Sequence, residues 1–152
     1  MSNFLKRLEL PPLWLLLCMF VAFWLSQEFP IYSFAHAAAH WVGRGLILIG
    51  LLVMAWSAMQ FIRKRTSIIP RETATTLVTS GPYQFTRNPI YLGDLLILLG
   101  WCVSLGAVST FVTAPAFVML INKRFIAGEE AMLKQTFPDE YAAWAAKVRR
   151  WI

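Results

Sequence analysis

Three long charge-free windows dominate the pattern of hydrophobic and polar positions along this chain. No Asp, Glu, Lys or Arg occurs from Leu10 to Gln27, from Gly45 to Ile62 or from Leu95 to Asn122. A helix that crosses a membrane needs about 20 residues, at a rise of about 1.5 Å per residue. The first two windows each fit one crossing, which predicts helices at about 10–28 and 44–62.

The third window is too long for one crossing once it is extended back to Pro89 past Asp94. It contains a break at Ser104-Leu105-Gly106, because glycine weakens a helix interior. We therefore expect a helical hairpin at 90–123, with helices at about 90–104 and 107–127. The predicted fold class is all-α: a polytopic membrane helical bundle with four transmembrane helices, in a single domain over 1–152.

The polar remainder of the chain is expected on the cytosolic side, as a loop at 63–88 and as C-terminal cytosolic helices at 128–152. Pro138 opens the last of these helices, with two acidic residues in its first turn. Apolar residues then recur at helical spacing, opposite basic ones: Tyr141, Trp144, Ala145, Val148 and Trp151. This pattern predicts a helix that lies in the membrane interface as a lid or anchor.

Composition and charge fit this membrane topology. Hydrophobic residues make up 58% of the chain and charged residues 14%, against roughly 25% charged in a typical soluble domain. Basic residues gather before the first window, between the second and third, and after the last, whereas Arg44 alone lies near the other side. The positive-inside rule then places both termini in the cytoplasm. Topology and anionic lipid explain the net charge of +6 without a nucleic-acid partner.

The segment from Gly81 to Gly93, Gly-Pro-Tyr-Gln-Phe-Thr-Arg-Asn-Pro-Ile-Tyr-Leu-Gly, places turn-forming and polar residues where a membrane helix should begin. Irregular backbone at membrane depth needs a protein or ligand partner. An ordinary helix start, with Asn88 as N-cap and Pro89 in the first turn, accounts for two of these residues. Arg87 either binds an anion at the helix N-terminus or reaches lipid phosphate.

A second polar segment follows the hairpin and contains Glu129 and Glu130. Glu130 and Lys134 are spaced as a favourable surface ion pair on a helix. Glu129 shares a helical face with Phe125 and Leu133, where a carboxylate needs a partner. The spacing therefore predicts that Glu129 is the functional residue of the two.

Cysteine and histidine positions give little indication of a metal site. Cys18 and Cys102 lie in apolar windows, without the spacing of a metal-binding or redox motif. His36 and His40 are one helical turn apart, but no third ligand lies nearby in the sequence. We expect no bound metal and two solvated histidines.

The two polar segments together resemble the isoprenylcysteine carboxyl methyltransferase and phospholipid N-methyltransferase group of small integral-membrane enzymes. The first motif of that group is Gly-Pro-Tyr-x-x-x-Arg-(His/Asn)-Pro-x-Tyr-x-Gly, which matches Gly81 to Gly93. About thirty residues later come Arg124, then Glu-Glu-x-x-Leu at 129–133, then Phe-x-x-Glu-Tyr at 137–141. The resemblance runs from about Thr66 to the C-terminus. Both motifs in this order, flanking a helical hairpin, make it specific.

The resemblance implies S-adenosylmethionine as the methyl donor and a lipophilic acceptor that enters laterally from the bilayer. It implies catalytic roles for Arg87, Arg124 and Glu129, with either arginine binding a carboxylate of donor or acceptor. The cofactor-binding residues that it implies are Gly81, Tyr83, Arg87, Asn88, Pro89, Tyr91, Gly93, Glu129 and Glu130. In such a site the tyrosines would pack on adenine or face the sulfonium, and Glu129 would hold the ribose hydroxyls or the amine.

Asn88 is a departure that leaves the acceptor open. Prenylcysteine enzymes usually have His at this position, whereas many bacterial relatives have Asn, which suits the inner membrane of a bacterium. Phe137-Pro138-Asp139 also replaces a usual Phe-Gly-x. Because Asn88 is no general base near neutral pH, we expect only hydrogen bonding from it, and carboxylate, amine and thiol acceptors remain possible. The alternatives are an NADPH-dependent sterol-type membrane reductase and a non-enzymatic membrane protein.

Overall fold

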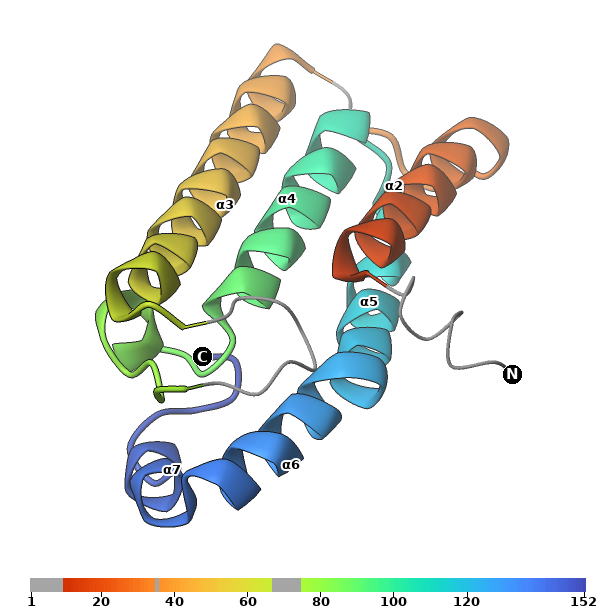
Figure 1. Cartoon of the computed structure of the whole chain (residues 1–152). Helices are drawn as coiled ribbons and strands as arrows, with labels where there is room; N and C mark the ends of the chain where they lie inside the picture. Colours follow the sequence, from red (N-terminus) through yellow and green to blue (C-terminus); the bar gives the residue numbers. More distant parts are fainter. Residues whose placement is uncertain (1–9, 35, 67–74) are drawn as a thin grey trace.

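The computed structural model describes residues 10–34, 36–66 and 75–152, which form a helical bundle (Figure 1). The helices that pack together in the bundle are α2 (Pro11–Glu28), α3 (Ala37–Lys64), α4 (Pro89–Leu105) and α5 (Thr113–Ile121). Over these described residues the predicted all-helical fold is confirmed, since the only β pairing is one isolated bridge between Ser33 and Ala107. The middle of the predicted loop at 63–88, together with Lys6, Arg7 and Arg71, lies outside the described residues.

The second helix starts earlier than the predicted residue 44. α3 begins at Ala37, because His36 has an extended backbone and its Nδ1 accepts a hydrogen bond from the Ala39 amide at 3.3 Å. A side-chain cap of this kind satisfies an amide that the first turn leaves without a partner. His36 is therefore a helix cap rather than simply a solvated side chain.

The predicted break between the hairpin arms lies at the end of α4. Gly106 follows Leu105 with a φ of +68°, and its amide closes the last turn onto the Cys102 and Val103 carbonyls. This left-handed conformation costs glycine little, which explains why the helix ends here. The two connections at this end of the bundle meet, since the Phe34 amide donates to the Gly106 carbonyl at 2.7 Å.

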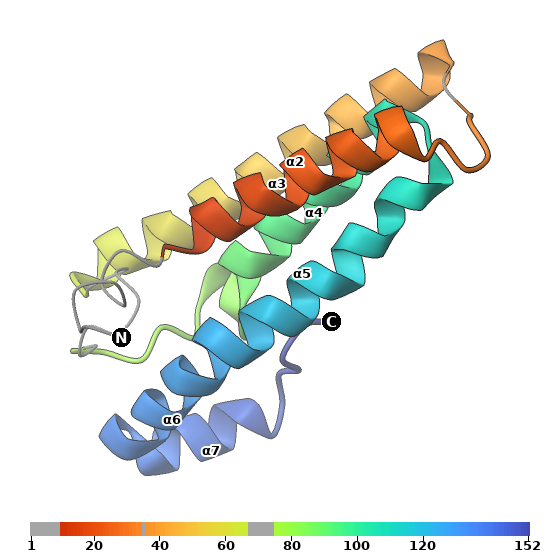
Figure 2. The same cartoon turned by 90° about the vertical axis from the view of Figure 1, so that its right-hand side faces the viewer.

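The second arm of the hairpin does not end at the predicted residue 127. A 3₁₀ turn at Val108–Val112 leads into α5, a π-helical turn at Asn122–Ile126 follows, and α6 continues to Thr136. Figure 2 shows α5 and α6 as one long helical path that extends past α2. α7 (Pro138–Ala145) then turns back beneath it. The predicted interfacial helix through Trp151 is thus too long, because residues 146–152 lie outside the helix.

Glycines bring α3 and α4 into close contact, and Figure 1 shows the two helices side by side. A Cβ on Gly50 would lie 2.6 Å from the Gly93 carbonyl oxygen, and one on Gly100 would lie 2.5 Å from the Gly43 carbonyl oxygen. Small residues allow this kind of backbone approach in membrane bundles. The last glycine of the Gly81–Gly93 segment therefore has a packing role.

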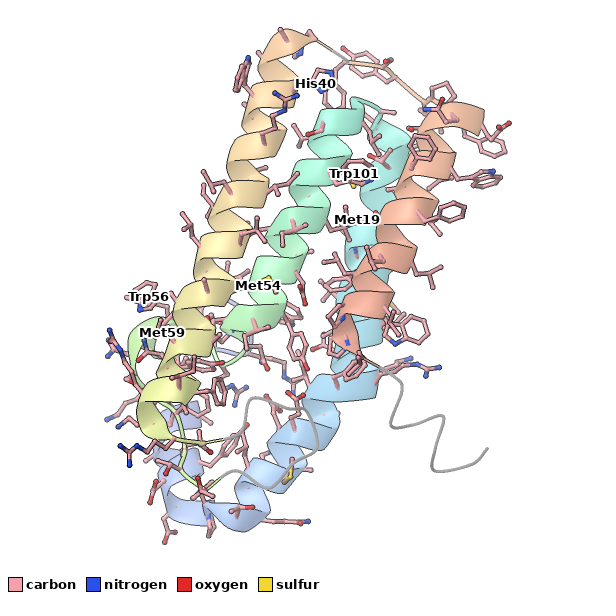
Figure 3. The ribbon with its side chains drawn as sticks, turned by 45° about the horizontal axis from the view of Figure 1, so that its top comes forward. Met19, His40, Met54, Trp56, Met59 and Trp101 are labelled. Carbon is pink, nitrogen blue, oxygen red and sulfur yellow. The ribbon has the colours of Figure 1, made fainter. Side chains whose placement is uncertain are left out.

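The core lies among α2, α4 and α5 and is apolar. Its buried members include Ala22, Leu98, Cys102, Phe117 and Ile121. The Trp101 indole donates to the Met19 carbonyl at 3.1 Å and ties α4 to α2; Figure 3 labels both residues.

Three helical segments are long and apolar enough to cross a membrane: Pro11–Glu28, Ala37–Lys64 and Val108–Thr136. α4 is apolar but shorter. The count of four crossings stays a prediction.

Reporter fusions test the topology. A reporter after Ile152 or inserted at Glu72 is expected in the cytoplasm, and one between α2 and α3 on the opposite face, because basic segments stay on the cytoplasmic side. Alkaline phosphatase and green fluorescent protein fusions measure this. Opposite locations for Glu72 and Ile152 would contradict a four-crossing bundle.

Candidate active site

The Gly81–Gly93 segment begins with a 3₁₀ turn at Gly81–Gln84 that packs on the end of α3. Gly81 has a φ of +62°, and a Cβ there would lie 2.8 Å from Cδ of Gln60. The ring of Tyr83 is buried edge-on against Phe61, with centroids 5.6 Å apart. The Tyr83 carbonyl accepts from the Trp144 indole at 2.9 Å. The backbone conformation at position 81 favours glycine, a larger residue there would also displace the Gln60 side chain, and the turn holds Tyr83 inside the protein.

Asn88 stands at the N-cap position of α4, but its side chain does not cap the helix. Its Nδ2 instead donates to the Arg150 carbonyl at 2.9 Å, and the Thr86 hydroxyl donates to the same oxygen at 3.1 Å. The Arg87 amide donates to the Arg149 carbonyl at 2.9 Å. The expected hydrogen-bonding role of Asn88 therefore includes fixing the C-terminal segment against the motif.

Glu130 pairs with two arginines that are far apart in the sequence, Arg87 and Arg150. It accepts from Arg150 Nε at 3.1 Å and from Arg150 Nη2 at 2.6 Å, and it lies 3.4 Å from Arg87 Nη2. Arg87 Nη1 also donates to the Tyr141 hydroxyl at 3.2 Å. Glu130 is 7% exposed, so its interpretation as a surface partner of Lys134 is wrong.

These contacts are charge-assisted and partly shielded from water, which makes them stronger than a surface pair. The hydrogen bond with Glu130 raises the pKa of Arg150.

Glu129 contacts the motif through Tyr91. The Tyr91 hydroxyl donates to Glu129 Oε1 at 2.7 Å, joining residues 38 positions apart in the sequence. Tyr91 itself is buried against Phe125, with ring centroids 6.3 Å apart. Burial, and then the negative charge of Glu129, raise the pKa of Tyr83, so its hydroxyl stays neutral. The two sequence motifs therefore meet at Tyr91 and Glu129, on the same end of the bundle as Arg87 and Glu130.

Arg124 lies on the π-helical turn, and its guanidinium stacks 4.7 Å above the Trp14 ring of α2. The described contacts therefore join Arg87 with Glu130 and Tyr91 with Glu129, and one contact of Arg124 is with Trp14 on α2. Sequence reasoning missed Arg150 and Thr86, whose partners are distant in sequence. The Arg-Arg-Trp ending of the chain was the available signal for Arg150.

A metal centre is not formed by the part of the chain that the structure describes, where no three His, Cys, Asp or Glu residues come together. Both cysteines are buried and free.

The helices are apolar enough to span a membrane, and the two polar motifs meet at one end of them. This arrangement is typical of integral-membrane enzymes. The sequence profile of the phospholipid methyltransferase family matches residues 38–140. The chain belongs to this family of membrane methyltransferases, within the group that includes isoprenylcysteine methyltransferases.

Three relatives illustrate the similarity. Protein-S-isoprenylcysteine O-methyltransferase B of Arabidopsis thaliana is 32% identical over 127 residues, which cover 78% of this chain and 63% of that protein. Cobalt-zinc-cadmium resistance protein CzcN of Cupriavidus metallidurans is 36% identical over 109 residues, 67% of this chain and 48% of its own length. An uncharacterized protein of Haemophilus influenzae is 43% identical over 63 residues, 41% of this chain and 100% of that one. The chain thus spans about half the length of the metal-resistance relative.

Proposed function

We propose that this protein transfers a methyl group from S-adenosylmethionine to a lipophilic acceptor at the cytosolic face of a bacterial inner membrane. The observation that carries the proposal is the meeting of the two motif segments, where Tyr91 donates to Glu129 at 2.7 Å. Arg87 and Glu130 lie beside each other at the same end of the bundle. Family membership supports the methyl transfer, and the apolar helices support access from the bilayer.

The residues at this end suit the polar groups of S-adenosylmethionine. Arg87 Nε is buried and has no hydrogen-bond partner among the described residues, so it would bind the carboxylate of the methionine part. Glu129 is half-buried and would accept hydrogen bonds from the ribose hydroxyls or the amine. The Tyr83 and Tyr91 rings would line the adenine or the sulfonium, since an aromatic face attracts a cation.

The bound donor supplies a methyl group on a positively charged sulfur. For such a displacement the protein mainly has to align the reactants and keep water out. The Asn88 contact with Arg150 and the pairing of Glu130 with both arginines would hold the motif rigid for this purpose. Arg87 and Glu129 then bind the donor, while Gly81 and Pro89 shape the backbone around it.

Calorimetry on the purified protein in detergent tests the donor. S-adenosylmethionine and its demethylated product are expected to bind in the presence of EDTA, because the described residues contain no group of side chains that could hold a metal ion. NADPH is the control ligand. Binding of NADPH without any response to S-adenosylmethionine would overturn the proposal and favour a membrane reductase.

A further inference from the structure

The guanidinium group of Arg87 is only partly paired in the candidate active site. Its Nη1 donates to the Tyr141 hydroxyl at 3.2 Å, and its Nη2 lies 3.4 Å from Glu130 Oε1. Its Nε is buried and has no hydrogen-bond partner among the described residues, which is costly for a donor. In a guanidinium group, Nε and Nη2 lie on one edge and can hold a carboxylate by two parallel hydrogen bonds. This edge is therefore the part of Arg87 that can bind an anionic ligand.

Glu130 lies beside this edge of Arg87 but is held mainly by Arg150. Arg150 Nε donates to Glu130 Oε1 at 3.1 Å, and Arg150 Nη2 donates to Glu130 Oε2 at 2.6 Å, so both carboxylate oxygens have a donor. The 3.4 Å separation from Arg87 is longer than the roughly 2.7–2.9 Å of a charge-assisted hydrogen bond. Glu130 is buried, so its carboxylate needs a protein partner. Without the Arg150 side chain, the Nε and Nη2 groups of Arg87 would take up this carboxylate.

The charges of these three side chains also suit a ligand with one carboxylate. The two guanidinium groups and the single carboxylate of Glu130 leave one net positive charge. Removal of the Arg150 side chain would leave none, and a ligand carboxylate at Arg87 would then be repelled by Glu130. Because charges interact more strongly where water is partly excluded, Arg150 favours anion binding at Arg87 through its effect on Glu130.

The main chain of Arg150 holds the backbone on both sides of Arg87. The Arg150 carbonyl accepts from the Thr86 hydroxyl at 3.1 Å and from Asn88 Nδ2 at 2.9 Å. The Arg87 amide donates to the carbonyl of the preceding residue, Arg149, at 2.9 Å. Because these bonds use main-chain carbonyls, a side-chain substitution at position 150 leaves them in place. The role of the Arg150 guanidinium can therefore be tested separately from the folding of the C-terminal segment.

We propose that Arg150 is a positioning residue for the methyl donor: it holds Glu130 so that the Nε edge of Arg87 stays free for the donor's carboxylate. The inference rests on the proposed function, in which Arg87 binds that carboxylate. Glu130 then links the two arginines and does not itself bind the donor. The effect of Arg150 is therefore expected only for a donor that has a carboxylate.

Calorimetry on the purified full chain in detergent tests this role. The ligands are S-adenosylmethionine and decarboxylated S-adenosylmethionine, which keeps the sulfonium and the amine but lacks the carboxylate. The variants are Arg150→Met, Arg150→Lys, Glu130→Gln, and Arg150→Met combined with Glu130→Gln. Lys147→Met removes the same unit of charge from an exposed side chain of the C-terminal segment and is the matched control. Circular dichroism gives the temperature range in which each variant is folded.

Arg150→Met is expected to bind S-adenosylmethionine about ten- to a hundredfold more weakly, as for the loss of a charge-assisted hydrogen bond. It should bind the decarboxylated ligand as the parent does. Arg150→Lys should lose less affinity, because lysine keeps the charge but not the two-point contact with Glu130. Adding Glu130→Gln to Arg150→Met should restore the affinity to that of Glu130→Gln alone, because a neutral amide does not capture Arg87.

A purely structural role of Arg150 would weaken the binding of both ligands and would not be relieved by the second substitution. Either result would overturn the positioning role and leave the proposed function standing. The same holds for equal binding of the two ligands by the parent, for unchanged affinity in Arg150→Met, and for an equal loss in Lys147→Met. Binding of neither ligand by the parent would instead overturn the proposed function.

Discussion

The Glu130→Gln protein is expected to be destabilised by about 3 kcal/mol, whereas Glu129→Gln keeps its stability and loses donor affinity. Glu130 is buried and paired with Arg87 and Arg150. Removing one partner of a buried charge network typically costs about 3–5 kcal/mol. The lower end applies because the Arg150 side chain is 43% exposed. For a chain of this length the Tm should fall by roughly 6–12 °C.

Glu129 bonds to Tyr91 at the edge of the site, and we propose that it contacts the donor. Loss of a charge-assisted hydrogen bond costs about 1.5–3 kcal/mol, which is about ten- to a hundredfold in affinity for S-adenosylmethionine. Circular dichroism in detergent gives the Tm, and calorimetry gives the affinity. Glu140→Gln, on the exposed side of α7, is the matched control. An unchanged Tm in Glu130→Gln would contradict the structural role, and unchanged affinity in Glu129→Gln would remove it from the donor site.

The sequence predicted the wrong environment for Glu130 because the helix before it is not regular. The prediction of which residues share a face assumed a regular α-helix, in which Phe125 and Glu129 lie on the same side. The π-helical turn at Asn122–Ile126 inserts one extra residue. Phe125 and Glu130, five residues apart, are therefore both buried. Single-sequence patterns carry no reliable signal for such a turn.

The C-terminal segment shows a second limit of sequence reasoning. The apolar stripe from Tyr141 predicted one helix to Trp151, and the start at Pro138 agrees with the structure. The helix instead ends at Ala145, and the carbonyls of residues 149–150 accept hydrogen bonds from the motif, 62 to 64 positions away. Local periodicity cannot reveal contacts at that distance in the chain. The hairpin break at Gly106, by contrast, was predictable because it follows from glycine's own backbone preference.

Gly50→Ala is expected to destabilise the bundle by about 3 kcal/mol, while Gly45→Ala on the same helix is expected to stabilise it slightly. A Cβ on Gly50 would lie 2.6 Å from the Gly93 carbonyl oxygen and 2.9 Å from Ile97. Backbone atoms cannot move aside as a flexible side chain does, so the added methyl group must push α4 away from α3. The expected loss of stability is therefore at the upper end of the range for overpacking, about 3 kcal/mol. A Cβ on Gly45 meets nothing within 4 Å, so alanine there gains about 0.5–1 kcal/mol of helix preference.

The effect of Gly50→Ala should also reach the active site, because α4 carries Tyr91 and begins at the motif. A displaced α4 would lengthen the 2.7 Å bond from Tyr91 to Glu129, so S-adenosylmethionine affinity should fall together with Tm. Thermal unfolding in detergent and calorimetry on both variants measure these changes. Because both substitutions add the same methyl group to the same helix, their difference isolates the contact with α4. Equal Tm shifts in the two proteins would show that α3 and α4 do not approach this closely at Gly50.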